Sequence, residues 1–445
     1  MATLLKTPRS WPAILLRPGT DDPTDLDAAI RAGAFAGLRA AIEQGPDGTI
    51  ETIAVAGLRG RGGSGYPTAD KWRTARAAVA RDGARPLVVA NGYGADAASR
   101  TDLELLERNP IAVIEGLAIA AISVGADEAI VAVRAEATEA VARLTAVIGA
   151  AEEANLLGED VAGSGLDVFV SVRTVQGAYM LGEETVLLKA LAGKRGQPEQ
   201  RPPHPAEKGF DGRPTVVQNV QTLAAVPWIL VNGAAAFAGI GPRDCPGTIL
   251  VSVRGPGGAG VAEVPFGTTL GDIVALAGAP KGPAKGGTIK AVLVGGPSGG
   301  ILPAAALDTK YTFGDLRAAG AHVGSGSVVA ADERACVVDL ARVLTRYCAD
   351  EACGKTIPCR IGTTRLAEIN ERMAAGTSRA GDVQLATDLA TDIVGSGLCD
   401  HERLATLPLM SGLRYFREEL DAHVERGVCP AGVCRPIALA AGAAH

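Results

Sequence analysis

The sequence predicts an α/β protein of three domains, in which a parallel-sheet domain is followed by a small β-rich domain and a helical bundle. Apolar strand-like runs alternate with helical runs up to residue 237, short strands with dense Gly and Pro turns follow residue 245, and apolar residues at helical spacing dominate after residue 332. The chain has 445 residues, 47% of them hydrophobic, which is enough for two or three domains. We expect domain boundaries at 1–240, 245–330 and 331–445.

The first domain is expected to contain a largely parallel sheet, because its strands alternate with helices. Continuous apolar runs predict buried strands at 87–91, 129–133 and 166–172. Helices are predicted at 110–122 and 178–191. The stretch 193–214 is rich in Gly, Pro and charge, and long loops of this kind are frequently functional, so we expect it to line a site.

The second and third domains differ in the secondary structure that their sequence patterns predict. Short strands separated by glycine-rich turns predict a domain of β-grasp size, with strands at 248–254, 261–265 and 289–294. The third domain is predicted as a helical bundle with helices at 336–350, 362–374, 383–394 and 412–425. Of the 8 cysteines, all except Cys245 lie in this last part of the chain.

Composition excludes several classes of protein. With Lys+Arg 43 and Asp+Glu 49, the net charge of -6 argues against binding to nucleic acid. No apolar run approaches the roughly 20 residues of a membrane-spanning helix, and the N-terminus does not have the pattern of a secretory signal, so we expect a cytoplasmic protein. In that compartment, crowded cysteines favour metal ligation over disulfides.

Two segments have the composition of a binding site. In GLRGRGGSGYPTADKW (57–72), Gly60, Gly62 and Gly65 fit a phosphate-binding glycine pattern, with Arg61 and Lys71 as cationic donors. The alternative is a flexible glycine turn, since the pattern follows a helix end rather than a strand.

The second segment, 177–198, begins with a glycine and Tyr179 and continues with two adjacent acids, Glu183 and Glu184. The acids by themselves are explained as first-turn charges that complement a helix dipole. The basic loop that follows at Lys194 and Arg195 favours a functional interpretation.

The cysteines fall into two sets. Cys353, Cys359 and Cys399 have the pattern of an iron–sulfur site, but a [4Fe–4S] cluster normally takes four thiolates. A second set offers one imidazole and three sulfurs, which suits tetrahedral zinc: Cys336, His423, Cys429 and Cys434. The alternative for this set is buried cysteines and a surface histidine without a metal.

Together these motifs resemble the NADH-binding flavoprotein component (the F-type subunit) of NADH-quinone oxidoreductase and its relatives in NAD-linked hydrogenases and formate dehydrogenases. The resemblance covers about 25–436 and rests on GLRGRGGSGYPT, GEET, GKRGQP, NVQTLAAVPWIL and CGKTIPCRIGT in the family order. It implies an α/β flavin-binding domain, a ubiquitin-like, soluble-ligand-binding β-grasp domain and a helical bundle with a [4Fe–4S] cluster. The CPAGVC tail resembles the hydrogenase branch and implies the zinc set.

The resemblance also implies site residues. Contacts to the FMN phosphate and ribityl chain are implied at Gly60, Arg61, Gly62 and Lys71. Contacts to the flavin ring and its edge are implied at Asn91, Tyr179, Glu183, Glu184, Asn219 and Thr222. NADH would stack over the flavin beside Tyr66, with Arg201 standing where the family has a lysine.

The chain departs from the family pattern beside the flavin. Tyr93 and Gly94 stand where the family has two acids, and only Asp96 keeps an acidic side chain in this segment. Further departures are Thr74, His204, Gln218 and Gln221.

Another departure affects the cluster, because Thr356 stands where the family has the middle cysteine of its motif. Threonine is a poor ligand for iron in a sulfur cage. Either Cys348 substitutes as the fourth ligand, or the cluster has three thiolates or is absent.

The resemblance implies an NADH dehydrogenase subunit that oxidises NADH through FMN and passes electrons to iron–sulfur centres. The implied partners are a thioredoxin-like [2Fe–2S] subunit and a larger cluster-bearing subunit, with peripheral attachment to a membrane complex as one arrangement. The alternative is a divergent paralogue that no longer oxidises NADH and serves in electron transfer or assembly.

Overall fold

The computed structural model describes residues 2–16, 22–279 and 289–434, and the chain divides into two compact units. The first comprises Met1–Val251 and Val261–Gly267, and the second Ser252–Gly260 and Thr268–His445. Strands β5 (Thr248–Gly255) and β6 (Gly258–Pro265) contribute residues to both. The boundary predicted near residue 330 lies inside the second unit, and the three-domain division stays a prediction.

A four-stranded parallel sheet organises the first unit: the sequence predicted its parallel character and three of its strands, but not the strand at Thr215–Asn219. Its order is β3-β2-β1-β4, formed by β1 (Leu87–Gly92), β2 (Glu128–Arg134), β3 (Phe169–Val175) and β4 (Thr215–Asn219). The third strand begins three residues later than expected because Val168 instead exchanges two backbone hydrogen bonds with Gly158, both 2.8 Å long.

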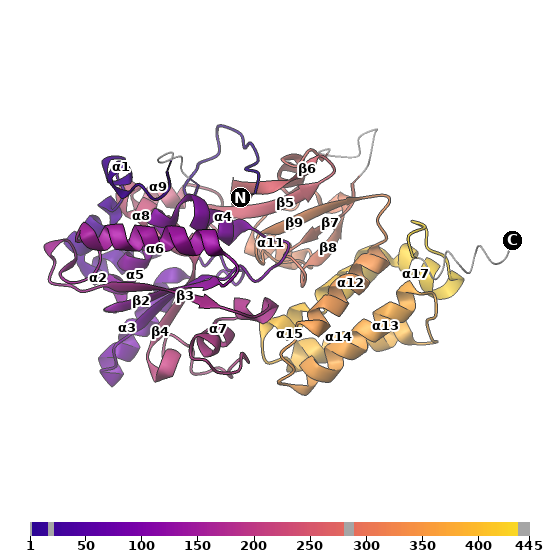
Figure 1. Ribbon diagram of the computed structural model, residues 1–445. Helices are drawn as coiled ribbons and strands as arrows, with labels where there is room; N and C mark the ends of the chain where they lie inside the picture. Colours follow the sequence, from indigo (N-terminus) through magenta and orange to yellow (C-terminus); the bar gives the residue numbers. More distant parts are fainter. Residues whose placement is uncertain (1, 17–21, 280–288, 435–445) are drawn as a thin grey trace. The chain divides into compact units, whose positions relative to one another are not determined.

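Helices cover both faces of this sheet. The helices of this unit are α1 (Leu26–Arg31), α2 (Ala36–Ala56), α3 (Thr68–Asp82), α4 (Thr101–Arg108), α5 (Pro110–Val124), α6 (Thr138–Glu153), α7 (Glu184–Leu191), α8 (Val220–Asn232) and α9 (Ala234–Ala238). Figure 1 shows α6 and α7 on opposite sides of the strands, while α3 packs against α5, where Arg76 donates to the Ser123 carbonyl oxygen at 3.2 Å. Helix α5 is buried almost all round, and at Gly116 a Cβ would lie 2.0 Å from the Leu223 carbonyl oxygen of α8, so only glycine allows this approach.

The second unit combines a mixed sheet with helices. The five-stranded sheet has the order β6-β5-β9-β7-β8, completed by β7 (Ile289–Val294), β8 (Gly300–Pro303) and β9 (Ser327–Asp332). The helices are α10 (Leu270–Ala275), α11 (Phe313–Ala318), α12 (Val337–Asp350), α13 (Thr364–Ala374), α14 (Asp382–Ser396), α15 (Asp400–Leu404), α16 (Leu407–Tyr415) and α17 (Arg417–Arg426). The prediction of one helix over 412–425 is wrong, because non-helical backbone at Phe416 (φ -126°, ψ 37°) separates α16 from α17.

The strand order predicts where a binding crevice lies in the first unit. The chain proceeds from β1 to β2 to β3 in one direction and then returns to add β4 on the other side of β1. In open parallel sheets, ligands bind outside the carboxyl ends of strands where the order reverses, here β1 and β4. Among the described residues, no helix has both the length and the apolar character required to cross a membrane.

Candidate functional site

Two asparagines lie at the carboxyl ends of β1 and β4. Asn91 and Asn219 are paired in the register of these strands. Asn91 Oδ1 accepts the Tyr93 N–H at 3.1 Å, and Asn219 caps α8 by accepting the Gln221 N–H at 2.9 Å. Both amides predicted as flavin contacts therefore stand at the point where the strand order reverses.

The glycine loop lies against the end of β4. It spans 59–67, is closed by a β-bridge between Arg59 and Pro67, and leads directly into α3. A Cβ on Gly62 would lie 3.3 Å from the Cβ of Asn219, so a larger residue here would press on the end of β4. The loop thus presents backbone close to the crevice, as phosphate binding requires.

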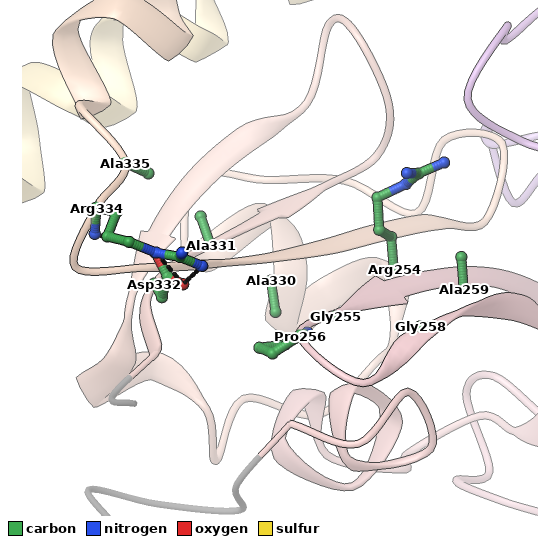
Figure 2. Close-up of a pocket in the computed structure, with 10 residues that line it drawn as sticks. All are labelled: Arg254, Gly255, Pro256, Gly258, Ala259, Ala330, Ala331, Asp332, Arg334 and Ala335. Carbon is green, nitrogen blue, oxygen red and sulfur yellow. Dashed lines mark hydrogen bonds and ion pairs between the residues drawn. The ribbon is translucent and has the colours of Figure 1, made fainter. Parts of the chain in front are cut away.

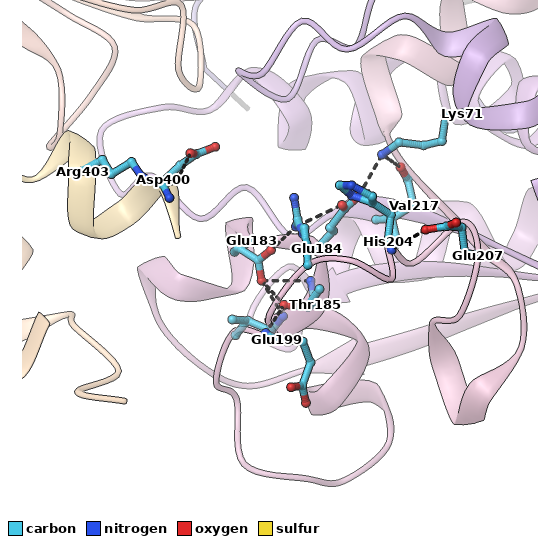
Figure 3. Close-up of polar contacts among 12 residues, drawn as sticks. Lys71, Glu183, Glu184, Thr185, Glu199, His204, Glu207, Val217, Asp400 and Arg403 are labelled. Carbon is cyan, nitrogen blue, oxygen red and sulfur yellow. Dashed lines mark hydrogen bonds and ion pairs between the residues drawn. The ribbon is translucent and has the colours of Figure 1, made fainter. Parts of the chain in front are cut away.

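A group of charged side chains from α3, α7 and the loop after α7 gathers beside the glycine loop (Figure 3). Lys71 Nζ donates to Glu184 Oε2 at 2.8 Å and to the Val217 carbonyl oxygen at 3.0 Å, and lies 6.0 Å from the centre of the exposed Tyr66 ring. Arg201 contacts Glu183 and lies 3.0 Å from Glu184. Burial favours the neutral form of Glu184, but Lys71 and Arg201 outweigh it and lower its pKa.

Glu183 caps a helix, a role that the sequence did not distinguish from that of Glu184. The predicted helix 178–191 begins only at Glu184, because Tyr179–Gly182 form a 3₁₀ turn and Glu183 caps α7 by accepting the Thr185 and Val186 N–H groups at 2.9 Å. A Cβ on Gly182 would lie 3.3 Å from that of Ala95, which places this turn beside the divergent segment 93–96.

Arg134, which sequence reasoning missed, holds that divergent segment. Its guanidinium donates to the carbonyl oxygens of Tyr93, at 2.9 Å, and Gly94, and lies 5.2 Å from the centre of the Tyr93 ring. Asp96 is buried and its Oδ1 accepts the Ala98 N–H at 2.8 Å. The signal for Arg134 was its place at the end of the second predicted strand, on the same edge as Asn91.

Asp102 was missed as well. Its two carboxylate oxygens accept hydrogen bonds of 2.8 Å from the side-chain amides of Asn219 and Gln221. Burial raises the pKa of Asp102, while these hydrogen bonds and Arg134 oppose the shift. In the sequence it resembles an ordinary first-turn acid of α4, and only the tertiary fold places it under the crevice. Gln218, the neighbour of Asn219, is buried in β4.

Arg61 is placed differently from Lys71, the other cationic donor predicted for the phosphate. Its side chain is 1% exposed and lies between the rings of Phe237 and Phe266, 5.6 and 5.2 Å from their centres. The guanidinium donates to the carbonyl oxygens of Thr248 (3.2 Å), Pro246 (2.7 Å) and Arg59. Only the backbone N–H faces another predicted site residue, donating to Thr222 Oγ1 at 2.8 Å, whereas the Gly60 N–H bonds to the Tyr66 carbonyl at 2.9 Å.

The predicted S₃N set is assembled in the second unit. The ligand atoms of Cys336, His423, Cys429 and Cys434 lie within 4.8 Å of one another and all four residues are buried. His423 is fully buried, which rules out the surface histidine of the alternative interpretation. Its Nδ1 lies 2.8 Å from the Glu419 carbonyl oxygen, so Nε2, 3.4 Å from two of the sulfurs, is left to face them.

The three sulfurs of this set differ in their electrostatic environment. Burial opposes ionisation of Cys429, but N–H groups of Val433 and Cys434 outweigh it and lower its pKa to about 6. Burial raises the pKa of Cys434 to about 12 and also raises that of Cys336. Three sulfurs and one imidazole nitrogen match the ligands of structural zinc.

The second set of cysteines is joined by a chain of hydrogen bonds. The Cys359 thiol hydrogen-bonds to Cys353 and lowers the pKa of that partly exposed thiol to about 6. The Cys359 N–H donates to Thr356 Oγ1 at 3.2 Å, and Thr356 in turn donates to Glu402, whose other oxygen accepts the Cys399 N–H at 3.4 Å. Thr356 and Glu402 thus link the segments that carry the three cysteines, whose thiols supply three of the four ligands of a [4Fe–4S] cluster.

A separate hollow of about 460 Å³ lies in the second unit (Figure 2). Its lining is mainly glycine, alanine and proline from β5, β6 and β9, with Arg254, Asp332 and Arg334 as the charged residues. Figure 2 shows Arg334 lying over Asp332, to which it is ion-paired at 2.6 Å. Sequence reasoning did not single out these residues.

Comparisons with known proteins identify the family of two regions of this chain. Residues 53–228 match the family described as the Nuo51 FMN-binding domain, and residues 339–423 match the NADH-ubiquinone oxidoreductase-F iron–sulfur binding region. The NADP-reducing hydrogenase subunit HndC of Solidesulfovibrio fructosivorans is 37% identical over 417 residues, covering 94% of this chain and 84% of the relative. An F-type subunit of the NADH-quinone oxidoreductase of Rhizobium meliloti is 37% identical over 424 residues, covering 94% of this chain and 99% of the relative.

A solved structure is similar as well. The crystal structure of an NAD⁺-reducing [NiFe]-hydrogenase in the H₂-reduced state contains a chain with 34% identity and a TM-score of 0.77 over 88% of this chain. This chain spans 65% of the length of that hydrogenase chain. The chain therefore belongs to the family of F-type subunits of NADH-quinone oxidoreductase and their hydrogenase relatives, with an FMN-binding domain and a 4Fe–4S binding region.

Proposed function

We propose that this chain is an NADH dehydrogenase subunit that oxidises NADH through FMN and passes the electrons to iron–sulfur centres of a larger complex. The observation that carries the proposal is that the glycine loop, Lys71, Asn91 and Asn219 gather at the carboxyl ends of β1 and β4, inside the FMN-binding region. Two relatives have names that state NADH-quinone oxidoreductase or NADP-reducing hydrogenase activity, which supports the same chemistry here.

We assign different residues to different parts of FMN and NADH. Lys71 and the backbone of 60–62 would hold the FMN phosphate, while Asn91, Asn219 and Thr222 would hydrogen-bond to the flavin and its ribityl chain. Residues expected nearer to the flavin edge and to NADH are Tyr66, Asp96, Tyr179, Glu183, Glu184, Arg201 and Gln218. FMN, when bound, accepts a hydride and releases electrons singly, and the protein's part is to orient both molecules.

The second unit would receive the electrons at an iron–sulfur cluster, and a zinc ion would stabilise its fold. We propose a cluster at Cys353, Cys359 and Cys399, a zinc ion at the S₃N set, and a β-grasp arrangement of the five-stranded sheet beside a helical bundle. A thioredoxin-like [2Fe–2S] subunit and a larger cluster-bearing subunit are the proposed partners. The cytoplasmic location remains a prediction.

One observation favours the alternative of a paralogue that does not oxidise NADH. Where the family has two acids, the backbone carbonyls of Tyr93 and Gly94 are held by Arg134. Gly94 has φ +59°, so an acid restored there would strain the backbone, and Tyr93→Asp is the cleaner variant to test. Faster flavin reduction by NADH in Tyr93→Asp would identify the lost acid as the limiting feature.

Replacing Lys71 by glutamine is expected to weaken FMN binding at least about tenfold, because it removes the cation expected at the phosphate, a loss of roughly 1.4 kcal/mol or more. Titration of the flavin-free protein with FMN, followed by flavin fluorescence, measures the affinity. Lys71→Arg should recover much of it.

The matched control is Arg73→Gln, two residues further along α3, which removes a more exposed cation paired with Glu51 and Asp70. Its FMN affinity should equal that of the wild type. Unchanged affinity in Lys71→Gln would contradict the assigned phosphate site, and wild-type protein that binds FMN but is not reduced by NADH would favour the paralogue.

A further inference from the structure

Thr356 occupies the position of the missing cysteine, and its side chain is directed at a single acid. Its hydroxyl donates to Glu402 Oε1 and accepts the Cys359 N–H at 3.2 Å. A neutral hydroxyl is a poor iron ligand, since clusters are held by thiolates. The position therefore lacks both the ligand and the negative charge that a cysteine would supply.

Glu402 lies at this gap. It is 1% exposed, and its Oε2 accepts the N–H groups of Leu398 and, at 3.4 Å, Cys399. These bonds belong to the capping box of α15, which accounts for Oε2 but not for the placement of Oε1 beside Thr356. Glu402 is also close enough to Cys353 and Cys359 to interact electrostatically with both thiols.

The buried carboxylate has hydrogen-bond donors but no counter-charge. No lysine or arginine among the described residues forms an ion pair with Glu402, although burying an unpaired carboxylate is costly. A cubane held by Cys353, Cys359 and Cys399 leaves one iron without a protein ligand, and a carboxylate oxygen can bind an iron ion at that position. The carboxylate would in turn replace the anionic charge lost when threonine stands in place of cysteine.

We propose that Glu402 is the fourth protein ligand of the iron–sulfur cluster, with Cys353, Cys359 and Cys399 as the three thiolates. The Thr356 hydroxyl holds the carboxylate in place by its hydrogen bond. The inference rests on the cluster of the proposed function and names the ligand that completes it. The cluster then has one oxygen-ligated iron, which is held less firmly than its three thiolate-bound neighbours.

Cys348, the substitute expected from the sequence, is directed elsewhere. It is fully buried on α12, and its thiol donates to the Pro297 carbonyl oxygen at 3.5 Å. Burial raises its pKa to about 12, which disfavours the thiolate that iron requires.

The test compares iron and sulfide content after anaerobic reconstitution with iron and sulfide. Glu402→Gln keeps the size of the side chain and an oxygen that can accept the capping N–H groups, but it loses the anion. We expect about four irons per chain in the wild type and about three in Glu402→Gln, as loss of one iron from a cubane requires. Thr356→Cys combined with Glu402→Gln should restore about four, and Cys348→Ala should keep four.

Mössbauer spectroscopy of the wild type shows, without any variant, whether the fourth iron is ligated by oxygen or by sulfur. One iron in four should show the higher isomer shift of oxygen ligation, and Thr356→Cys should shift it to the sulfur-ligated value. Four sulfur-ligated irons in the wild type, four irons in Glu402→Gln, or loss of one iron in Cys348→Ala would overturn the assignment of Glu402. Wild type that takes up neither iron nor sulfide would instead overturn the cluster of the proposed function, and this inference with it.

Discussion

Replacing His423 by alanine is expected to abolish zinc binding and to loosen the end of the second unit. The four ligand atoms lie within 4.8 Å of one another, and they join the start of α12 to α17 and the segment that follows it. In small zinc-dependent domains, metal binding contributes on the order of 10 kcal/mol of apparent folding free energy. Loss of one ligand leaves three buried sulfurs, which hold the metal and stabilise this junction far less firmly.

Zinc content by elemental analysis and hydrogen exchange of residues 417–434 measure this result. The wild type should hold about one zinc per chain, as one four-ligand site requires, and its α17 amides should be protected. Cys245→Ala is the matched control, since it removes a buried thiol from the other unit and should leave zinc content unchanged. Wild type without zinc, or equal protection in His423→Ala, would contradict the metal site.

Replacing Arg61 by methionine is expected to lower the free energy of unfolding of the first unit by about 3 to 5 kcal/mol, the range for breaking a buried charged network. The side chain satisfies three backbone carbonyls and lies between Phe237 and Phe266. Burial lowers its pKa to about 10, so the guanidinium is still charged at neutral pH. Methionine fills part of the space but donates no hydrogen bond to the carbonyls.

Urea unfolding followed by tryptophan fluorescence measures this loss in the first unit, because all three tryptophans, Trp11, Trp72 and Trp228, lie there. Arg61→Lys should also destabilise, because one ammonium cannot reach carbonyls that the planar guanidinium bonds in several directions. If Arg61 instead served mainly as a side-chain phosphate ligand, Arg61→Lys would weaken FMN binding and leave unfolding unchanged.

The parallel sheet and the S₃N set were predictable because each depends on a local pattern. Buried strands such as 87–91 are continuous apolar runs, and His423, Cys429 and Cys434 lie close together in the chain with the donor types that zinc prefers. The point where the strand order reverses was not predictable, because it depends on β4, which the sequence did not predict as a strand.

The residues that sequence reasoning missed owe their roles to tertiary contacts. Arg134 and Asp102 act at the carboxyl ends of β1 and β4 only because β2 and α4 lie beside these strands. The local sequence places Arg134 at the end of a predicted strand, but nothing local distinguishes Asp102 from a surface charge. Arg61 fits a phosphate motif, yet its side chain donates hydrogen bonds to Pro246 and Thr248, which lie 185 and 187 positions later in the chain. Glu402 gains significance only from its contact with Thr356, 46 positions earlier.

The most direct test of the proposed function is the absorption spectrum of the anaerobically purified protein before and after addition of NADH, with flavin, iron, sulfide and zinc assayed on the same sample. We predict flavin bands that bleach on NADH addition, about four irons per chain as a cubane requires, and zinc in addition. Flavin that does not respond to NADH, or protein that contains zinc without flavin and iron, would contradict the proposed NADH dehydrogenase activity and favour the scaffold paralogue.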